Sequence, residues 1–537
     1  MSLDRRQLLL SGAAAGVAAA APKMALAAAG DAAVNAFFDK TCSEILDDAP
    51  EFATNLGLDK GAYAWRKSKM SDLSWAGVED SFAFCAKGLK TLASLPDAGL
   101  SPAAKLNKEV VAYALQLGLD AKPFTYGENT WSSAMAEAST PYVVSQQSGT
   151  YSGAAEFLDS QHTIETKADC DAFLDRMRQV ATQLDQETER VKRDAGQGVI
   201  APDFILSNTL GQQQGMLATP AAQARFVASL ADRAKAKGVA GDWAAQATKI
   251  VEAEIYPALT RQYETLKGLQ SRSGHDAGVW RFKDGEAYYS WLLKAGTNTP
   301  MTAEEIHNVG LEQNKAIEAR MDAILKANGL TQGTVGERMI ALGDDPRFLF
   351  PDTDAGRDQI LAYLNQLIGS VRPKLASQFK LQLKAPVQVR RVPVDIQDGA
   401  GQGYMNTGSL DGSRPSTYYI NLKSTKNWPK YSLPTLTWHE TIPGHAWQGA
   451  YLTETGALPL IRVLMSGFNS YVEGWALYAE QLGDEMGMYQ DDWAGQLGYL
   501  QAQRFRAIRL VVDTGLHAKR WTREQAIDWA VANSGRT

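Results

Sequence analysis

Apolar residues follow a helical period over most of the chain, up to about residue 380. In one stretch they are spaced by steps of four, three, four and seven residues: Phe173, Met177, Val180, Leu184 and Val191. This spacing places the side chains on one face of a helix, which we expect to end near Gly196. A second helix is predicted to begin at Thr302, where Glu305 completes a capping box, and to end at Gly329. The pattern therefore predicts a mainly α fold.

The period changes to alternation in two short segments after residue 380. Apolar residues alternate over 387–396, with a shift of one position that indicates a bulge at 390–391, and Pro393 favours an edge strand. A second strand is predicted over 416–422, after a Gly-rich connection. No internal repeat or linker is visible, so we expect one large helical domain with a small sheet over 28–537.

Residues 1–27 have the order of a twin-arginine export signal. Arg5 and Arg6 precede an apolar run of small residues, and 25–27 read Ala-Leu-Ala, which resembles a cleavage site. The alternative is an alanine-rich first helix of the fold. We expect a mature chain that begins near Ala28 and is periplasmic or secreted. No later segment has about 18 uninterrupted apolar residues, so we expect no membrane contact in the mature form.

Composition excludes several classes of protein. The 537 residues are 45% hydrophobic and 21% charged, which is typical of a globular protein and not of a disordered chain. The net charge of −6 comes without a basic block, so nucleic acid is not an expected partner. The three cysteines, Cys42, Cys85 and Cys170, are far apart, which excludes a disulfide scaffold and a cysteine zinc cluster.

The strongest chemical signal is His-Glu-Thr-Ile-Pro-Gly-His at 439–445. In the metallopeptidase motif H-E-x-x-H, two histidines one helical turn apart bind zinc and the glutamate activates water. Here the spacing of six would put the histidines roughly 240° apart on a regular helix. Pro443 is expected to break the helix and Gly444 to allow the distorted backbone, so that His445 can return to the metal bound by His439. The alternative is a helix end with two unrelated histidines.

Two further carboxylates follow in a predicted helix. Glu473, Leu477 and Glu480 share one helix face, and carboxylates on a face that also carries leucine are costly to bury unless a cation neutralises them. For Glu473 we favour a metal ligand. For Glu480 we favour a solvated position.

Six segments of the chain carry a family resemblance: H-E-T-I-P-G-H (439–445), E-G-W-A-L-Y-A-E (473–480), R-L-V-V-D-T-G-L-H-A-K-R-W (509–521), D-G-S-R-P-S-T-Y-Y-I-N (411–421), D-G-E-A-Y-Y-S-W-L-L (284–293) and T-A-E-E-I-H-N-V-G (302–310). Together they resemble the bacterial domain-of-unknown-function family 885, from about residue 30 to the end. That family resembles the glutamate-ligand zinc peptidases, mainly helical zincin-like proteins with a deep active-site channel and a small sheet beside the cleft. The resemblance implies that His439, His445 and Glu473 bind Zn²⁺ and that Glu440 is the general base.

The chain departs from the family pattern at two places. Members often have a second histidine directly after the motif, where this chain has Ala446. The pattern also continues with a further helical stretch that contains an Arg-Tyr pair and a Pro-Gly-Gln-Ala segment. We therefore expect the C-terminus to be truncated at Thr537.

Two pairs of polar residues are further candidates for catalysis. Asp513 and His517 stand at i and i+4, so that the carboxylate can orient an imidazole that stabilises an oxyanion; a purely structural pair is the alternative. Tyr418 and Tyr419 point to opposite faces of their strand, so at most one hydroxyl can face the metal. We assign Tyr419 to catalysis, with a core position as the alternative, and Tyr418 to substrate binding.

Arg506 and Arg509, one turn apart, are predicted to hold a substrate carboxylate, although a solvated face would explain them almost as well. Together these residues predict an exported zinc metallopeptidase that hydrolyses short peptides or peptide-like amides. The alternatives are a periplasmic peptide-binding or chaperone-like protein without turnover, and a hydrolase of non-peptide amides.

Overall fold

The structure is a computed structural model that describes residues 29–136, 139–394, 397, 401–456 and 458–535. It is mainly α-helical with one small sheet, as the sequence predicts. The export signal predicted at residues 1–27 lies outside the described residues.

The helices of the N-terminal half are α2 (Ala29–Asp48), α3 (Pro50–Asn55), α4 (Trp75–Ser94), α5 (Pro102–Asp120), α6 (Trp131–Met135), α7 (Thr150–Ser160), α8 (Lys167–Gly196), α9 (Asp203–Ala218), α10 (Arg225–Ala236), α11 (Trp243–Ile250) and α12 (Tyr256–Leu269). Those of the C-terminal half are α13 (Gly285–Thr297), α14 (Ala303–Ala327), α15 (Val335–Gly343), α16 (Asp354–Gln378), α17 (Leu433–Glu440), α18 (His445–Thr455), α19 (Leu460–Leu464), α20 (Asn469–Glu485), α21 (Trp493–His517) and α22 (Arg523–Ser534).

The two helices predicted in detail are confirmed. The predicted apolar stripe is buried on α8, which ends at Gly196 as expected. The capping box at the start of α14 is present: the hydroxyl of Thr302 accepts from the amide of Glu305, whose carboxylate accepts from the amide of Thr302. These caps satisfy amides that have no partner within the helix, and so fix where the helix begins.

The sheet has the order β1-β3-β2. Strand β1 (Val387–Arg391) is parallel to β3 (Ser416–Ile420), and β2 (Gly403–Asn406) is antiparallel to β3. The predicted edge position of the first strand is confirmed, but the bulge is wrong because pairing with β3 is continuous through Arg391. Beyond Arg391 the amide of the buried Val392 still donates to the carbonyl of Ile420, whereas Val394 is exposed.

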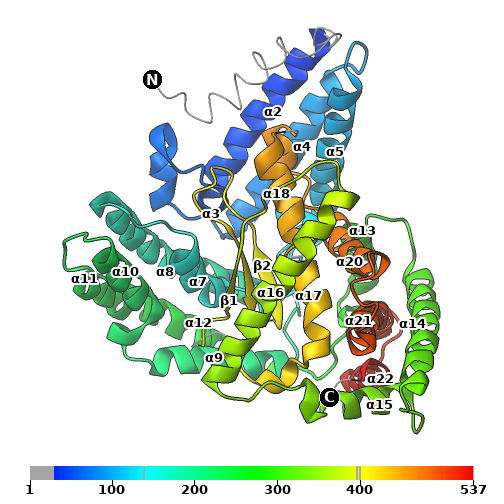
Figure 1. The fold of residues 1–537 in the computed structure, drawn as a ribbon. Coiled ribbons are helices and arrows are strands. Elements are labelled where there is room, and N and C mark those ends of the chain that lie inside the picture. Colours follow the sequence, from blue (N-terminus) through cyan, green and yellow to red (C-terminus); the bar gives the residue numbers. More distant parts are fainter. Residues whose placement is uncertain (1–28, 137–138, 395–396, 398–400, 457, 536–537) are drawn as a thin grey trace.

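The sheet lies near the middle of the molecule between two groups of helices (Figure 1). Helix α16 crosses in front of it, α7 to α12 lie on one side, and α13, α14, α20 and α21 lie on the other. One face of the sheet packs on α16 and on the start of α17 through buried apolar side chains: Ile360, Leu364, Tyr418, Ile420, Leu422, Trp428 and Leu433. This packing holds α17, which carries the predicted metal-binding motif, against the sheet.

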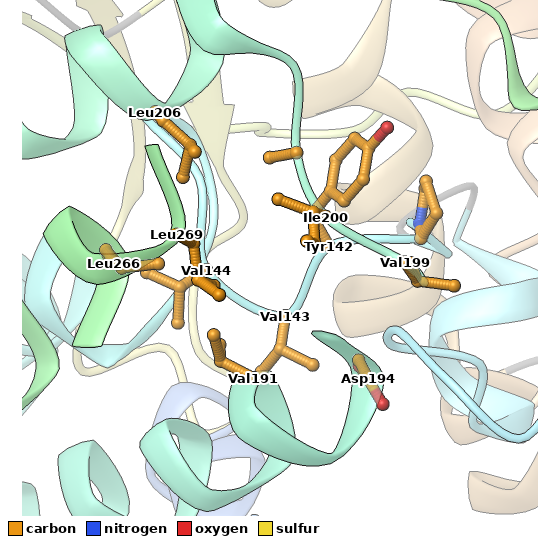
Figure 2. Close-up of a pocket in the computed structure, with 12 residues that line it drawn as sticks. Tyr142, Val143, Val144, Val191, Asp194, Val199, Ile200, Leu206, Leu266 and Leu269 are labelled. Carbon is orange, nitrogen blue, oxygen red and sulfur yellow. The ribbon is translucent and has the colours of Figure 1, made fainter. Parts of the chain in front are cut away.

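An apolar pocket lies in the group of helices on the side of α8 (Figure 2). It is lined by Pro141, Tyr142, Val143, Val144, Val191, Asp194, Val199, Ile200, Ala201, Leu206, Leu266 and Leu269. None of the predicted site residues lines it. All three cysteines are buried and free. Among the helices of the described residues, none is long and apolar enough to cross a membrane.

Glu187 on α8 makes stability depend on pH. Its side chain is buried and accepts hydrogen bonds from the amide and the hydroxyl of Thr150, both at 2.8 Å. Burial raises its pKa from 4.5 to about 7. The folded chain therefore holds a proton that the unfolded chain releases, and stability is lost as pH rises through this range.

We expect the titration of Glu187 to lower the free energy of unfolding by roughly 3 kcal/mol between pH 4.5 and pH 8. Glu187→Gln should flatten the pH dependence measured by urea unfolding, whereas the exposed neighbour Glu189→Gln should not. An unchanged slope in Glu187→Gln would contradict the assignment.

Candidate metal centre

The predicted break in the motif helix is confirmed. Helix α17 has Pro434 in its first turn and ends at Glu440, and α18 begins at His445. The Ile442–Pro443 peptide bond between the two helices is cis.

Gly444 makes the return of the chain sterically possible. A Cβ atom at this position would lie 1.9 Å from the carbonyl oxygen of His439, which no side chain tolerates. The amide of Gly444 donates to the carbonyl of Trp438 at 2.9 Å, and the indole N–H of Trp475 donates to the carbonyl of Pro443 at 2.8 Å. These bonds fold the start of α18 back onto the end of α17.

His439, His445 and Glu473 come together as predicted. The two imidazole rings are 4.8 Å apart between centroids and nearly perpendicular, at 85°. His439 Nε2 lies 3.3 Å from Glu473 Oε2, and His445 Nε2 lies 3.6 Å from Glu473 Oε1. One ligand atom from each residue lies within 4.8 Å of the others, so the group could hold a metal ion.

The ligand atoms of these three side chains fit a metal ion. Two imidazoles and one carboxylate suit zinc and leave one tetrahedral position open. His445 Nδ1 is buried without a hydrogen-bond partner among the described residues, whereas Glu473 Oε2 lies 3.3 Å from His439 Nε2 and 3.4 Å from Arg506 Nη1. The three side chains converge closely enough for one ion to contact all of them, and this convergence is the observation that favours a metal.

The charge state of the three residues is coupled. Burial raises the pKa of Glu473, but the two imidazoles outweigh it and hold that pKa well below its usual range. Burial lowers the pKa of His439, but Glu473 and Glu480 outweigh it and raise the pKa to about 9. Nε2 of His439 either donates to Glu473 or, when neutral, accepts from Arg506, and only the neutral form offers the lone pair that a metal needs.

Glu480 is part of this site, and the interpretation of a solvated Glu480 is wrong. Its side chain is 3% exposed, accepts from His439 Nδ1 at 2.8 Å, and accepts from the hydroxyl of Thr435 at 2.5 Å. A carboxylate that binds the far nitrogen of a ligating histidine fixes the ring and its tautomer, with Nε2 free for a metal. The available signal was the seven-residue spacing from Glu473, which places both carboxylates on one helix face.

We expect Glu480→Gln to weaken zinc binding by about 10-fold to 100-fold, because the imidazole of His439 loses its charged partner. A competition titration with a chromophoric chelator would measure the change. Glu485→Gln, at an exposed position of the same helix, is the matched control. Equal affinity in the Glu480 variant and in wild type would show that the contact does not support the metal.

Glu440 lies deep beside these residues. It is buried, and burial raises its pKa, with Glu473 adding to the effect and the two imidazoles opposing it. Tyr418 is fully buried, and its hydroxyl has no hydrogen-bond partner among the described residues. Burial raises the pKa of Tyr418 well above 10, and Glu440 raises it further. Tyr418 also packs in one apolar cluster with Leu433 of α17, so it lies on the side of the sheet that faces the helix of Glu440.

Tyr419 points to the other face of β3. Its ring stacks on Tyr404 with the two ring centroids 5.0 Å apart. Burial raises the pKa of Tyr419, and the carboxylate of Glu156 on α7 raises it further. The alternation along the strand is as predicted, but Tyr418, not Tyr419, faces the predicted base.

Arg506 reaches the predicted ligands. Its Nη2 lies 3.0 Å from His439 Nε2, and its Nη1 lies 3.4 Å from Glu473 Oε2. The side chain is 30% exposed, so it also faces solvent. Arg509 lies one turn further along α21 and is exposed.

One family of known proteins matches most of the chain. Residues 50–537 match the family described as bacterial protein of unknown function (DUF885). The chain belongs to this family. No curated protein matches the chain.

Two solved structures are similar to this DUF885 protein. One is described as the putative lipoprotein from Colwellia psychrerythraea: it is 31% identical, has a TM-score of 0.89, and the match covers 95% of this chain and 87% of that one. The other is described as a putative lipoprotein of unknown function from Shewanella oneidensis, at 16% identity and a TM-score of 0.64, with 94% and 87% covered. The second likeness concerns the fold alone.

In the DUF885 chain, His517 lies away from the three predicted ligands. It is eleven residues after Arg506 on α21, or roughly 16 Å along the helix. Its Nδ1 accepts from the amide of Val279 at 3.1 Å, and Asp513 accepts from the hydroxyl of Tyr289 at 2.5 Å. Asp513 and His517 therefore each have a partner from another part of the chain, and these partners gave no recognisable signal in the sequence.

Proposed function

We propose that this DUF885 protein is a zinc-dependent peptidase that hydrolyses short peptides or peptide-like amides. The observation that carries the proposal is the group of His439, His445 and Glu473, of which His439 is buried and the other two are partly buried, with the buried Glu440 directly after the first histidine. The resemblance to the glutamate-ligand zinc peptidases supports the same chemistry.

A zinc ion on these three side chains would supply a Lewis acid that polarises the scissile carbonyl and activates water. Glu440 takes a proton from the attacking water and gives it to the leaving amine nitrogen. Its raised pKa suits this role, because a general base works best when its pKa lies near the working pH. Glu480 keeps the imidazole of His439 in place throughout.

Two further features suit a peptide substrate. The guanidinium of Arg506, at hydrogen-bonding distance from His439, is placed to bind a substrate carbonyl or carboxylate oxygen. Strand β2 lies at an edge of the sheet and contacts α17, so an extended peptide can pair with its backbone there.

We also propose that the protein is exported to the periplasm. The order of charged, apolar and small residues over 1–27 supports this location, and the similar structure from Colwellia psychrerythraea is described as a putative lipoprotein.

Digestion of a peptide library by the purified full chain tests the proposal. We expect mass spectrometry to detect cleavage that a chelator abolishes and added zinc restores. Cleavage that is insensitive to chelation would contradict the role of the metal. Binding of peptides without any cleavage would favour the binding-protein alternative, and cleavage confined to non-peptide amides would favour the amidase.

A further inference from the structure

Helix α21 has one face buried against α14 and another that carries charged and polar residues. On the buried face, Ala507 and Val511 pack on Gly310, where a Cβ would lie 2.8 to 2.9 Å from its neighbours, and Thr514 bonds to the imidazole of His307. The helical period places a different set on a neighbouring face, roughly 120° around the helix; in chain order these are Arg506, Arg509, Asp513 and His517. This face begins at the predicted metal ligands and runs toward the far end of α21.

Two of the motifs that carry the family resemblance meet at that far end. The hydroxyl of Tyr289, from α13 in the segment 284–293, donates to Asp513 Oδ1 at 2.5 Å. The ring of Tyr289 also lies 5.2 Å from that of His517. The amide of Val279, in a short 3₁₀ turn before α13, donates to His517 Nδ1 at 3.1 Å. Segments more than 200 residues apart thus build one cluster outside the metal centre.

The cluster presents one acceptor and one donor. Tyr289 is buried and orients the exposed carboxylate of Asp513 through Oδ1. Burial lowers the pKa of His517, so its ring is neutral at physiological pH. Because Nδ1 accepts a hydrogen bond, the proton of the neutral ring is on Nε2. A fixed carboxylate beside an imidazole N–H matches an ammonium group followed by a carbonyl oxygen, which is the chemistry of a peptide N-terminus.

The spacing along the helix gives the length of the bound segment. Asp513 is seven residues after Arg506, or roughly 10 Å along the helix axis. An extended peptide rises about 3.3 Å per residue, so about three residues span this distance.

We propose that Asp513, held by Tyr289, binds the N-terminal ammonium of a peptide whose scissile carbonyl lies about three residues away at the metal centre, with His517 donating to the first carbonyl. This inference rests on the proposed peptidase function. It assigns Asp513 and His517 to substrate recognition, with Tyr289 as a positioning residue.

Matched peptides test the assignment. Alanine peptides of two to six residues, labelled at the C-terminal end and bearing either a free or an acetylated N-terminus, are incubated with the full chain. We expect the free amine to raise kcat/KM by about 10-fold to 100-fold, as for a charge-assisted hydrogen bond, and the cut to fall about three residues from the N-terminus. Asp513→Asn should remove this preference for the free amine, Tyr289→Phe should weaken it, and the exposed Asp528→Asn should leave it unchanged.

Two results would overturn the assignment: wild type that cleaves acetylated and free peptides equally, or Asp513→Asn that keeps the discrimination. A binding measurement separates this inference from the peptidase proposal. If no peptide is cleaved, fluorescence anisotropy of the same labelled peptides still supports the subsite when affinity depends on the free amine and on Asp513. Binding that is indifferent to both overturns it.

Discussion

Glu440→Gln is expected to lower peptide turnover by roughly 10²-fold to 10⁴-fold, the usual share of general acid–base catalysis. Glutamine keeps the shape of the buried side chain but cannot accept a proton from water. Glu440 is not one of the three residues that could hold the ion, so the variant should keep its zinc. Steady-state kinetics on a peptide found in the library digest would measure the loss, with metal content determined on the same sample.

Glu454→Gln is a suitable control, because Glu454 on α18 accepts from the backbone amides of Lys384 and Ala385 and contacts no predicted ligand. Turnover in Glu440→Gln equal to that of wild type would remove Glu440 from the mechanism. Loss of zinc together with turnover would instead show that Glu440 helps to hold the ion.

Gly444→Ala is expected to cost about 3 kcal/mol or more in the free energy of unfolding. The added Cβ would meet the carbonyl oxygens of His439 and Trp438 at 1.9 and 2.4 Å, and these belong to backbone that is held by α17. The start of α18 must move to relieve the clash, which carries His445 away from His439. Urea unfolding and zinc content should therefore both change.

Gly474→Ala offers the matched comparison. Gly474 lies within α20 beside Glu473, and a Cβ there meets nothing within 4 Å. Alanine is the better helix former by about 0.8 to 1 kcal/mol, so this variant should be slightly stabilised and keep its metal. If Gly444→Ala were as stable as wild type, this result would contradict the close approach of Gly444 to the carbonyl oxygens at the end of α17.

The parts of the site that follow from local chemistry could be predicted from the sequence. Proline cannot continue a helix, and Pro443 therefore marked the break that brings His445 back to His439. Capping residues likewise fixed the start of α14 at Thr302. Glu473 followed from the cost of placing a carboxylate beside Leu477 on one helix face.

The parts that depend on packing could not be predicted in the same way. Alternation put Tyr418 and Tyr419 on opposite faces, but only the position of α17 decides that Tyr418 faces Glu440. Glu480 occupies the same helix face as Glu473, and burial against Thr435 distinguishes it from a solvated residue. The short β2 lies in a Gly-rich connection, with too few residues to show a period.

Zinc content of wild type and His445→Ala is the most direct test of the metal centre. Both proteins are stripped with a chelator, dialysed against zinc and analysed by mass spectrometry of the metal. His275→Ala, which removes an exposed imidazole paired with Asp203 and Glu524, serves as the control. We expect one zinc per chain in wild type and in the control, and a loss of bound zinc in His445→Ala. A full equivalent of zinc in His445→Ala, or none in wild type, would contradict the proposed centre.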